Sequence, residues 1–131
     1  MATVPLLRDE EAGAEALAVF DDIREKRQTD FVNNFWRGLA HDPALLRATW
    51  ERVQTVMAPG ALDPLVKELI YIAVSTANGC DYCVHSHTAA AKAKGMTPAQ
   101  HGELLAVIAM AAQTNALATA LSVPVDDRFR A

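Results

Sequence analysis

An N-capping side chain followed directly by proline occurs at three places in this chain, and no other feature constrains its fold as strongly. The three pairs are Asp42-Pro43, Asp63-Pro64 and Thr97-Pro98. Asp and Thr accept backbone N–H bonds at a helix start, and proline suits the first helical position because an N–H there would have no partner. Gln100 completes a capping box with Thr97. The signals predict helices that begin at residues 43, 64 and 98.

Apolar residues at intervals of three and four extend the helical pattern to the rest of the chain. They predict one helix from Glu11 to about Arg27 and a short second helix over Phe31–Leu39. Pro59-Gly60, Gly79 and Gly95 then end the third, fourth and fifth helices. No segment shows the alternation of a strand. We therefore predict an all-α fold, a compact bundle of about six helices.

Length and charge narrow the class of protein. A chain of 131 residues is about one domain long, so we expect a single domain over residues 1–131. The net charge of −4 gives no reason to expect nucleic acid or an anionic membrane as a partner. We see no apolar run near the roughly 20 residues that span a bilayer, and no signal peptide over Met1–Pro5. The expected location is cytoplasmic, where a cysteine pair is more often catalytic or metal-binding than structural.

Two features of the later helices suggest assembly. The fourth helix is apolar almost all round, which predicts a central position, and the last two are rich in alanine. Alanine favours helices in any context, but small side chains also permit close packing against another subunit. Both interpretations stay open. Because so little polar surface is left on a short chain, we expect a homo-oligomer.

The only two cysteines, Cys80 and Cys83, have C-x-x-C spacing at the expected start of the fifth helix. Residues three apart on a helix lie roughly 5 Å apart between Cα atoms, which is inside the range of a disulfide. Unpaired N–H groups and the helix dipole at this position favour the thiolate over the thiol. The pair therefore predicts a thiol redox centre.

A histidine and a glutamate are placed to serve these thiols. His87 follows Cys83 by one helical turn on the same face, whereas His85 should point elsewhere. If the fourth and fifth helices form a hairpin, Glu68 lies level with His87. We expect a relay of Glu68, His87 and Cys83 in which the glutamate orients the imidazole. His87 is too far along the axis from Cys80, so Cys83 is the predicted nucleophile.

Simpler accounts of the same residues exist. The cysteines could be incidental buried thiols or part of a zinc site with His85 and His87, although His85 points away from the others on one helix. Glu68 could be a buried structural carboxylate. Tyr82 could be a packing aromatic at the mouth of the site or contribute its hydroxyl.

The pattern E-x11-C-x-x-C-x3-H, with an alanine-rich turn and a glycine after it, resembles the alkylhydroperoxidase D-like branch of the carboxymuconolactone decarboxylase superfamily. The resemblance implies a small helical subunit in homotrimers or homohexamers, and chemistry without metal, haem or flavin. By position, Cys83 would become the sulfenic acid, Cys80 would resolve it, and His87 and Glu68 would form the relay. Tyr82 stands where one well-known peroxidase of the family has a histidine.

These observations together predict an oxidoreductase: a thiol-dependent peroxidase with peroxiredoxin-type, antioxidant activity, or a disulfide reductase. Its partners would be a peroxide and a dithiol reductant, either a lipoyl group or a thioredoxin-like protein. One alternative is a lyase or isomerase that acts on a small carboxylated lactone with Glu68 and His87. Another is a non-enzymatic subunit that senses redox state.

Overall fold

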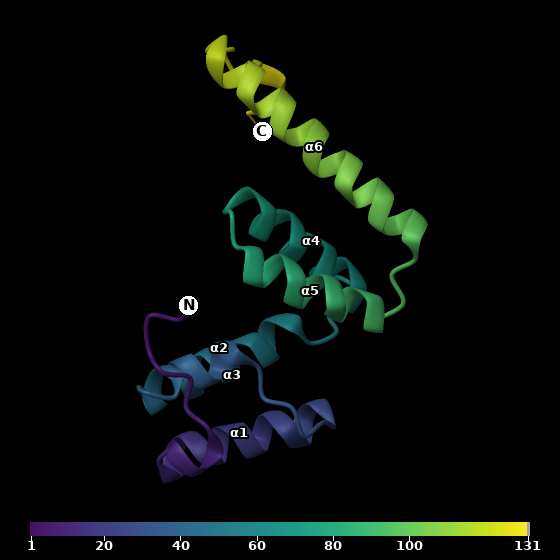
Figure 1. Ribbon diagram of the computed structural model, residues 1–131. Coiled ribbons are helices and arrows are strands. Elements are labelled where there is room, and N and C mark those ends of the chain that lie inside the picture. The colour runs from purple at the N-terminus through teal and green to yellow at the C-terminus, as the bar shows by residue number, and fades with distance from the viewer. Residues whose placement is uncertain (131) are drawn as a thin grey trace. The chain divides into compact units, whose positions relative to one another are not determined.

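The computed structural model describes residues 1–130, and within them the protein is entirely helical (Figure 1). Two 3-10 turns and six α-helices follow one another without a strand in this part of the chain. Their bounds are η1 Asp9–Glu11, α1 Ala14–Arg27, α2 Asn34–Leu39, α3 Pro43–Met57, α4 Pro64–Ala77, α5 Asp81–Ala93, α6 Pro98–Ala120 and η2 Asp127–Phe129. The predicted all-α fold and its six helices are confirmed.

Helices begin at all three predicted positions, Pro43, Pro64 and Pro98, and the capping side chain before each proline accepts a backbone N–H. The Asp42 side chain accepts the Leu45 N–H at 3.0 Å, and the Asp63 side chain accepts the Leu65 N–H at 2.8 Å. At the start of α6, Thr97 and Gln100 exchange side-chain and backbone bonds in a capping box. Local capping chemistry therefore determines where α3, α4 and α6 begin.

The chain forms two compact units, Met1–Ala58 and Pro59–Ala131. The single domain over residues 1–131 stays a prediction. In the first unit α1 and α2 pack against α3 around a core of large aromatic and aliphatic side chains. The buried members are Ala16, Val19, Phe20, Ile23, Val32, Trp36, Ala40, Leu46 and Trp50. Burial of these apolar side chains stabilises the packing of the three helices.

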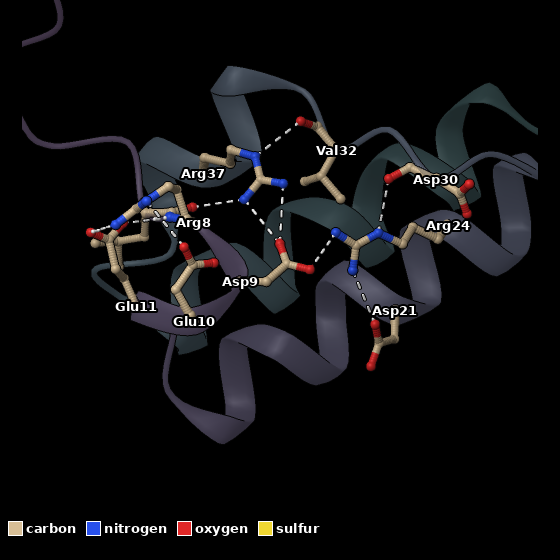
Figure 2. A network of polar contacts seen from close by, with 10 residues as sticks. Arg8, Asp9, Glu10, Glu11, Asp21, Arg24, Asp30, Val32 and Arg37 are labelled. Carbon is tan, nitrogen blue, oxygen red and sulfur yellow. Dashed lines mark hydrogen bonds and ion pairs between the residues drawn. The ribbon is translucent and has the colours of Figure 1, made fainter.

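A charged network on the first unit centres on the carboxylate of Asp9, in η1 (Figure 2). One oxygen accepts from Arg24 of α1 at 2.6 Å, and the other accepts from Arg37 of α2 at 3.1 Å. Arg37 also donates to the Leu7 carbonyl at 2.8 Å. The network fastens the N-terminal segment to two helices.

The second unit has a much smaller core. Here α4 and α5 form a hairpin, and α6 packs on α4. The buried apolar residues are Ile72, Ala91 and Met96, with Leu65, Leu69, Leu104 and Ile108 packed against them. As expected of a central helix, α4 contacts both other helices of this unit. It is not buried all round in the isolated chain, because Val66, Ile70 and Val74 are exposed.

The long helix α6 contains no buried residue. Its 23 residues have a mean hydropathy of 1.3 over the most apolar window, which is enough for a membrane span by length and composition alone. The polar residues Gln113–Asn115 interrupt this helix, so the average is reached without an apolar run of roughly 20 residues. One such helix is weak evidence for a membrane, since core helices of soluble proteins pass the same test, so the absence of a membrane partner stays a prediction.

Candidate active site

The turn between α4 and α5 places the first cysteine. Gly79 has a φ of +69°, in the left-handed region that glycine adopts readily. Its N–H donates to the Thr76 carbonyl at 3.1 Å, and the Cys80 N–H donates to the Ser75 carbonyl at 2.9 Å. These two bonds make a Schellman motif. The residue that completes the end of α4 is therefore also the residue that caps α5.

Cys80 and Cys83 are joined by a disulfide, with their Cα atoms 5.3 Å apart. The expected helical spacing of the pair is thus confirmed. Cys80 is the N-cap of α5, and its sulfur accepts the Cys83 N–H at 3.2 Å. Both cysteines are half-buried, so a small reagent can reach them. The structure shows the oxidised form of a dithiol pair at a helix N-terminus.

The expected pairing of the glutamate with the histidine is present. His87 Nδ1 lies 2.7 Å from Glu68 Oε2, and the Glu68 side chain is 5 % exposed. A carboxylate only accepts hydrogen bonds, so Nδ1 carries the proton and donates it. In the neutral imidazole the lone pair is then on Nε2. This arrangement lets His87 accept a proton at Nε2 while Glu68 holds the ring.

The second oxygen of Glu68 has a partner that the sequence did not suggest. Lys94 Nζ donates to Oε1 at 2.9 Å. Burial by itself raises the pKa of the Glu68 carboxyl, but the hydrogen bonds from His87 and Lys94 and the charge of Lys94 outweigh it and lower the pKa below the ordinary value. Glu68 is therefore an ionised, fully bonded carboxylate.

A tyrosine fixes the plane of the imidazole. The rings of Tyr71 and His87 stack with centroids 3.5 Å apart and an interplanar angle of 19°. Tyr71 follows Glu68 by three residues on α4, so both reach the same side of the hairpin. The ring of His87 is thus held at its edge by a carboxylate and over its face by an aromatic ring.

Comparison with known proteins places this site in a family. The sequence pattern of the carboxymuconolactone decarboxylase family matches residues 43–126. The chain belongs to that family. The family match takes in both cysteines and the whole Glu68–His87 pair. No curated protein shows significant similarity to the chain.

A solved structure resembles this member of the carboxymuconolactone decarboxylase family over its full length. The crystal structure of the alkylhydroperoxidase AhpD core from Rhodospirillum rubrum is 67 % identical, with a TM-score of 0.97. The alignment covers 100 % of this chain and 98 % of the other. The predicted resemblance to the alkylhydroperoxidase D-like branch is confirmed, and with it the fold.

The other predicted residues of this family member fall outside the Glu68–His87 contact. His85 Nδ1 lies 3.0 Å from the Asp81 carbonyl oxygen, and its side chain is 79 % exposed, so it points elsewhere as expected. Within residues 1–130 no group of three or more His, Cys, Asp or Glu side chains gathers as metal ligands would. Tyr82, beside Cys83, is 44 % exposed. A role for its hydroxyl stays a prediction.

Sequence reasoning missed Lys94 and Tyr71. Lys94 is seven residues after His87, two helical turns along the same face of α5. Tyr71 is three residues after Glu68. Helical spacing measured from the two predicted site residues, rather than from the cysteines, marks both as neighbours along the helices, but it does not predict the contacts that their side chains make.

Proposed function

We propose that this protein is a thiol-dependent peroxidase that reduces a hydroperoxide with the Cys80–Cys83 pair. One observation supports it most: the disulfide at the N-terminus of α5 lies one turn before an imidazole that is bonded to a buried carboxylate. Such a pair stores two electrons, and a histidine beside it supplies the acid–base group that thiol chemistry needs.

The reaction begins from the reduced pair. The Cys83 thiolate attacks one peroxide oxygen, so that an S–O bond forms and the O–O bond breaks. The leaving alkoxide takes a proton and departs as the alcohol, and Cys83 is left as a sulfenic acid. The Cys80 thiol then attacks the Cys83 sulfur and forms the disulfide, and water departs. The peroxide gains two electrons, and the two thiols lose them.

His87 and Glu68 move the protons in this scheme. Nε2 of His87 takes the proton of the Cys83 thiol, directly or through one water, and returns it to the leaving oxygen. Glu68 holds Nδ1 protonated, keeps the ring in place and stabilises the transient imidazolium, as the third member of a nucleophile, base and orienter set does. His87 sits one turn after Cys83 and nearly two turns after Cys80, which favours Cys83 as the nucleophile.

A dithiol resets the site. One thiolate of the dithiol attacks the Cys80–Cys83 disulfide and forms a mixed disulfide with one of the cysteines. The second thiol of the dithiol then attacks the mixed disulfide, so the reductant departs as its own disulfide and both cysteines are thiols again. A lipoyl group and a thioredoxin-like protein both have the required pair of thiols, and the cytoplasm keeps such reductants reduced. With a protein disulfide in place of the peroxide, the same residues would act as a disulfide reductase.

The test is consumption of organic hydroperoxide with a panel of dithiols. Wild type should turn over with at least one of them, and Cys83→Ser should not. The matched pair His87→Asn and His85→Asn separates the relay from a general effect of histidine on α5, and only His87→Asn should lose activity. An activity on a carboxylated lactone that survives Cys83→Ser would instead support a lyase. No activity, but a disulfide that alters binding to another protein, would support a redox-sensing subunit.

We also propose that the protein works as a homotrimer or homohexamer. The apolar side chains along α6 are exposed in the isolated chain, among them Leu105, Val107, Met110 and Leu117. A second copy of the chain can cover them in a closed symmetric assembly. Light scattering at micromolar concentration should give a mass near three or six chains, and a monomer would contradict the proposal.

A further inference from the structure

Lys94 lies at a position that the backbone specifies closely. It is the C-cap of α5, and the next residue, Gly95, has a φ of +95°. The Gly95 N–H donates to the Lys92 carbonyl at 3.0 Å, and the Met96 N–H donates to the Ala91 carbonyl at 3.0 Å. This second Schellman motif ends the helix, and the burial of Met96 secures it. The lysine therefore leaves the helix from a fixed point.

From that point the side chain reaches back to α4. Its ammonium lies 2.9 Å from Oε1 of Glu68, while His87 lies 2.7 Å from Oε2. One buried carboxylate thus serves two basic groups, one oxygen each. Lys94 is 39 % exposed at its side chain, so water still solvates part of its charge.

We propose that Lys94 is a positioning residue of this site: it fixes Glu68 and compensates the carboxylate charge, so that His87 stays neutral with its lone pair on Nε2. The proposal rests on the proposed function, in which His87 is the base. A buried carboxylate with no other cation nearby would attract a second proton onto the imidazole. With the ammonium in place, an imidazolium would be a second cation on the same carboxylate and is disfavoured.

Two side chains of α4 contact the His87 ring: Glu68 at its edge and Tyr71 over its face. Lys94 acts on the ring through Glu68, and in the reduced protein the Cys83 thiol is the proposed proton partner of Nε2. The side chains of α6 that pack on the same core are the apolar Leu104 and Ile108. The charge beside the Nδ1 edge of the ring is thus set by the Glu68 carboxylate and the Lys94 ammonium bonded to it.

The experiment compares Lys94→Met with wild type in the full-length protein, and the spectra are recorded on the oxidised form, in which Cys83 is in the disulfide and has no proton to give to His87. In nitrogen-15 spectra at pH 7, wild-type His87 should show a neutral ring protonated at Nδ1. Lys94→Met should show more imidazolium, and the acid limb of its pH–rate profile should move to higher pH by about half a unit or more. Lys94→Arg should restore both readouts. Lys92→Met, which removes an exposed lysine two residues earlier on α5, should change neither.

Unchanged His87 signals in Lys94→Met would overturn the proposal whatever the activity, and so would a shift that Lys92→Met reproduces. A wild-type protein that consumes no peroxide with any dithiol would instead contradict the proposed function. The spectra would still decide the role of Lys94, because they need no turnover.

Discussion

Two carboxylates in this molecule each bridge two basic side chains, but the two networks differ in burial and in the kind of partner. In the first unit Asp9 bridges Arg24 and Arg37 (Figure 2). In the second unit Glu68 bridges His87 and Lys94. The side chain of Asp9 is 40 % exposed, whereas that of Glu68 is 5 % exposed. Both carboxyls have pKa values below the ordinary range.

The partners account for the difference. A guanidinium keeps its proton under all ordinary conditions, so the Asp9 network can only hold the chain together. An imidazole takes up and releases a proton near neutral pH, so the Glu68 network can also move one. A buried carboxylate therefore indicates proton chemistry most strongly when one of its partners titrates. The following predictions test that distinction.

The largest difference should appear in activity. Glu68→Gln removes the charge that orients and stabilises His87, and peroxide consumption should fall about 10³-fold, within the range of general acid–base contributions. Asp9→Asn removes one charge from the first unit and should leave the rate within about twofold of wild type. Steady-state kinetics with one dithiol measure both. An equal loss in the two variants would mean that the Glu68 network has no special part in the chemistry.

The next contrast concerns the cores. Phe20 is fully buried in the first unit, and Phe20→Ala should lower the free energy of unfolding by about 3–5 kcal/mol. Val107 on α6 is 66 % exposed in the isolated chain, so Val107→Asp should change that free energy little. It should, however, break the proposed assembly, since it introduces a charge into an apolar contact. Urea denaturation and light scattering check the two effects, and an intact oligomer in Val107→Asp would exclude this face from the interface.

Sequence alone predicted the local features of this protein well. Three capping pairs located α3, α4 and α6, and the period of the apolar residues located the others, because these signals act within one helical turn. The contact between Glu68 and His87 could also be predicted from the sequence. Because the rise per residue of a helix is known, the distance of each residue from the turn of a helical hairpin can be counted, and residues at equal distances lie beside each other.

The sequence did not predict features that depend on the rotation of each helix about its axis or on how far a long side chain reaches. Counting gives the level of Lys94 but not the reach of its ammonium across to α4, and it gives Tyr71 no reason to stack on an imidazole. The exposure of α4 was missed for a related reason. An all-round apolar helix predicts complete burial, but it does not say whether the same chain or another copy covers it.

Acid should weaken both carboxylate networks, and high salt should weaken the Asp9 network more than the Glu68 network. Each carboxyl has a lowered pKa in the folded protein, so its stabilisation is complete above the ordinary carboxyl pKa of roughly 4 and is lost as the pH falls through the folded value. The melting temperature should therefore fall below about pH 4.5. High salt should reduce the contribution of Asp9 more than that of Glu68, because only exposed pairs are screened strongly. Thermal melts of Asp9→Asn and Glu68→Gln over pH and salt measure this, and equal salt effects would contradict the contrast.

The smallest expected effects compare how the two units end a helix. In the first, Gln28 takes the left-handed position after α1 with a φ of +52°, and in the second, Gly79 takes it after α4 with a φ of +69°. A Cβ at Gly79 would meet nothing within 4 Å, so Gly79→Ala should cost only the backbone term, about 1 kcal/mol. Gln28→Gly should stabilise the protein by a few tenths of a kcal/mol, because glycine adopts the same left-handed conformation without strain.

Gly102→Ala, inside α6 with open space around it, is the control and should stabilise the protein by about 0.5–1 kcal/mol. Urea denaturation should thus give opposite signs for the two alanine variants. The same sign in both would show that the left-handed turn before Cys80 is not what makes Gly79 necessary.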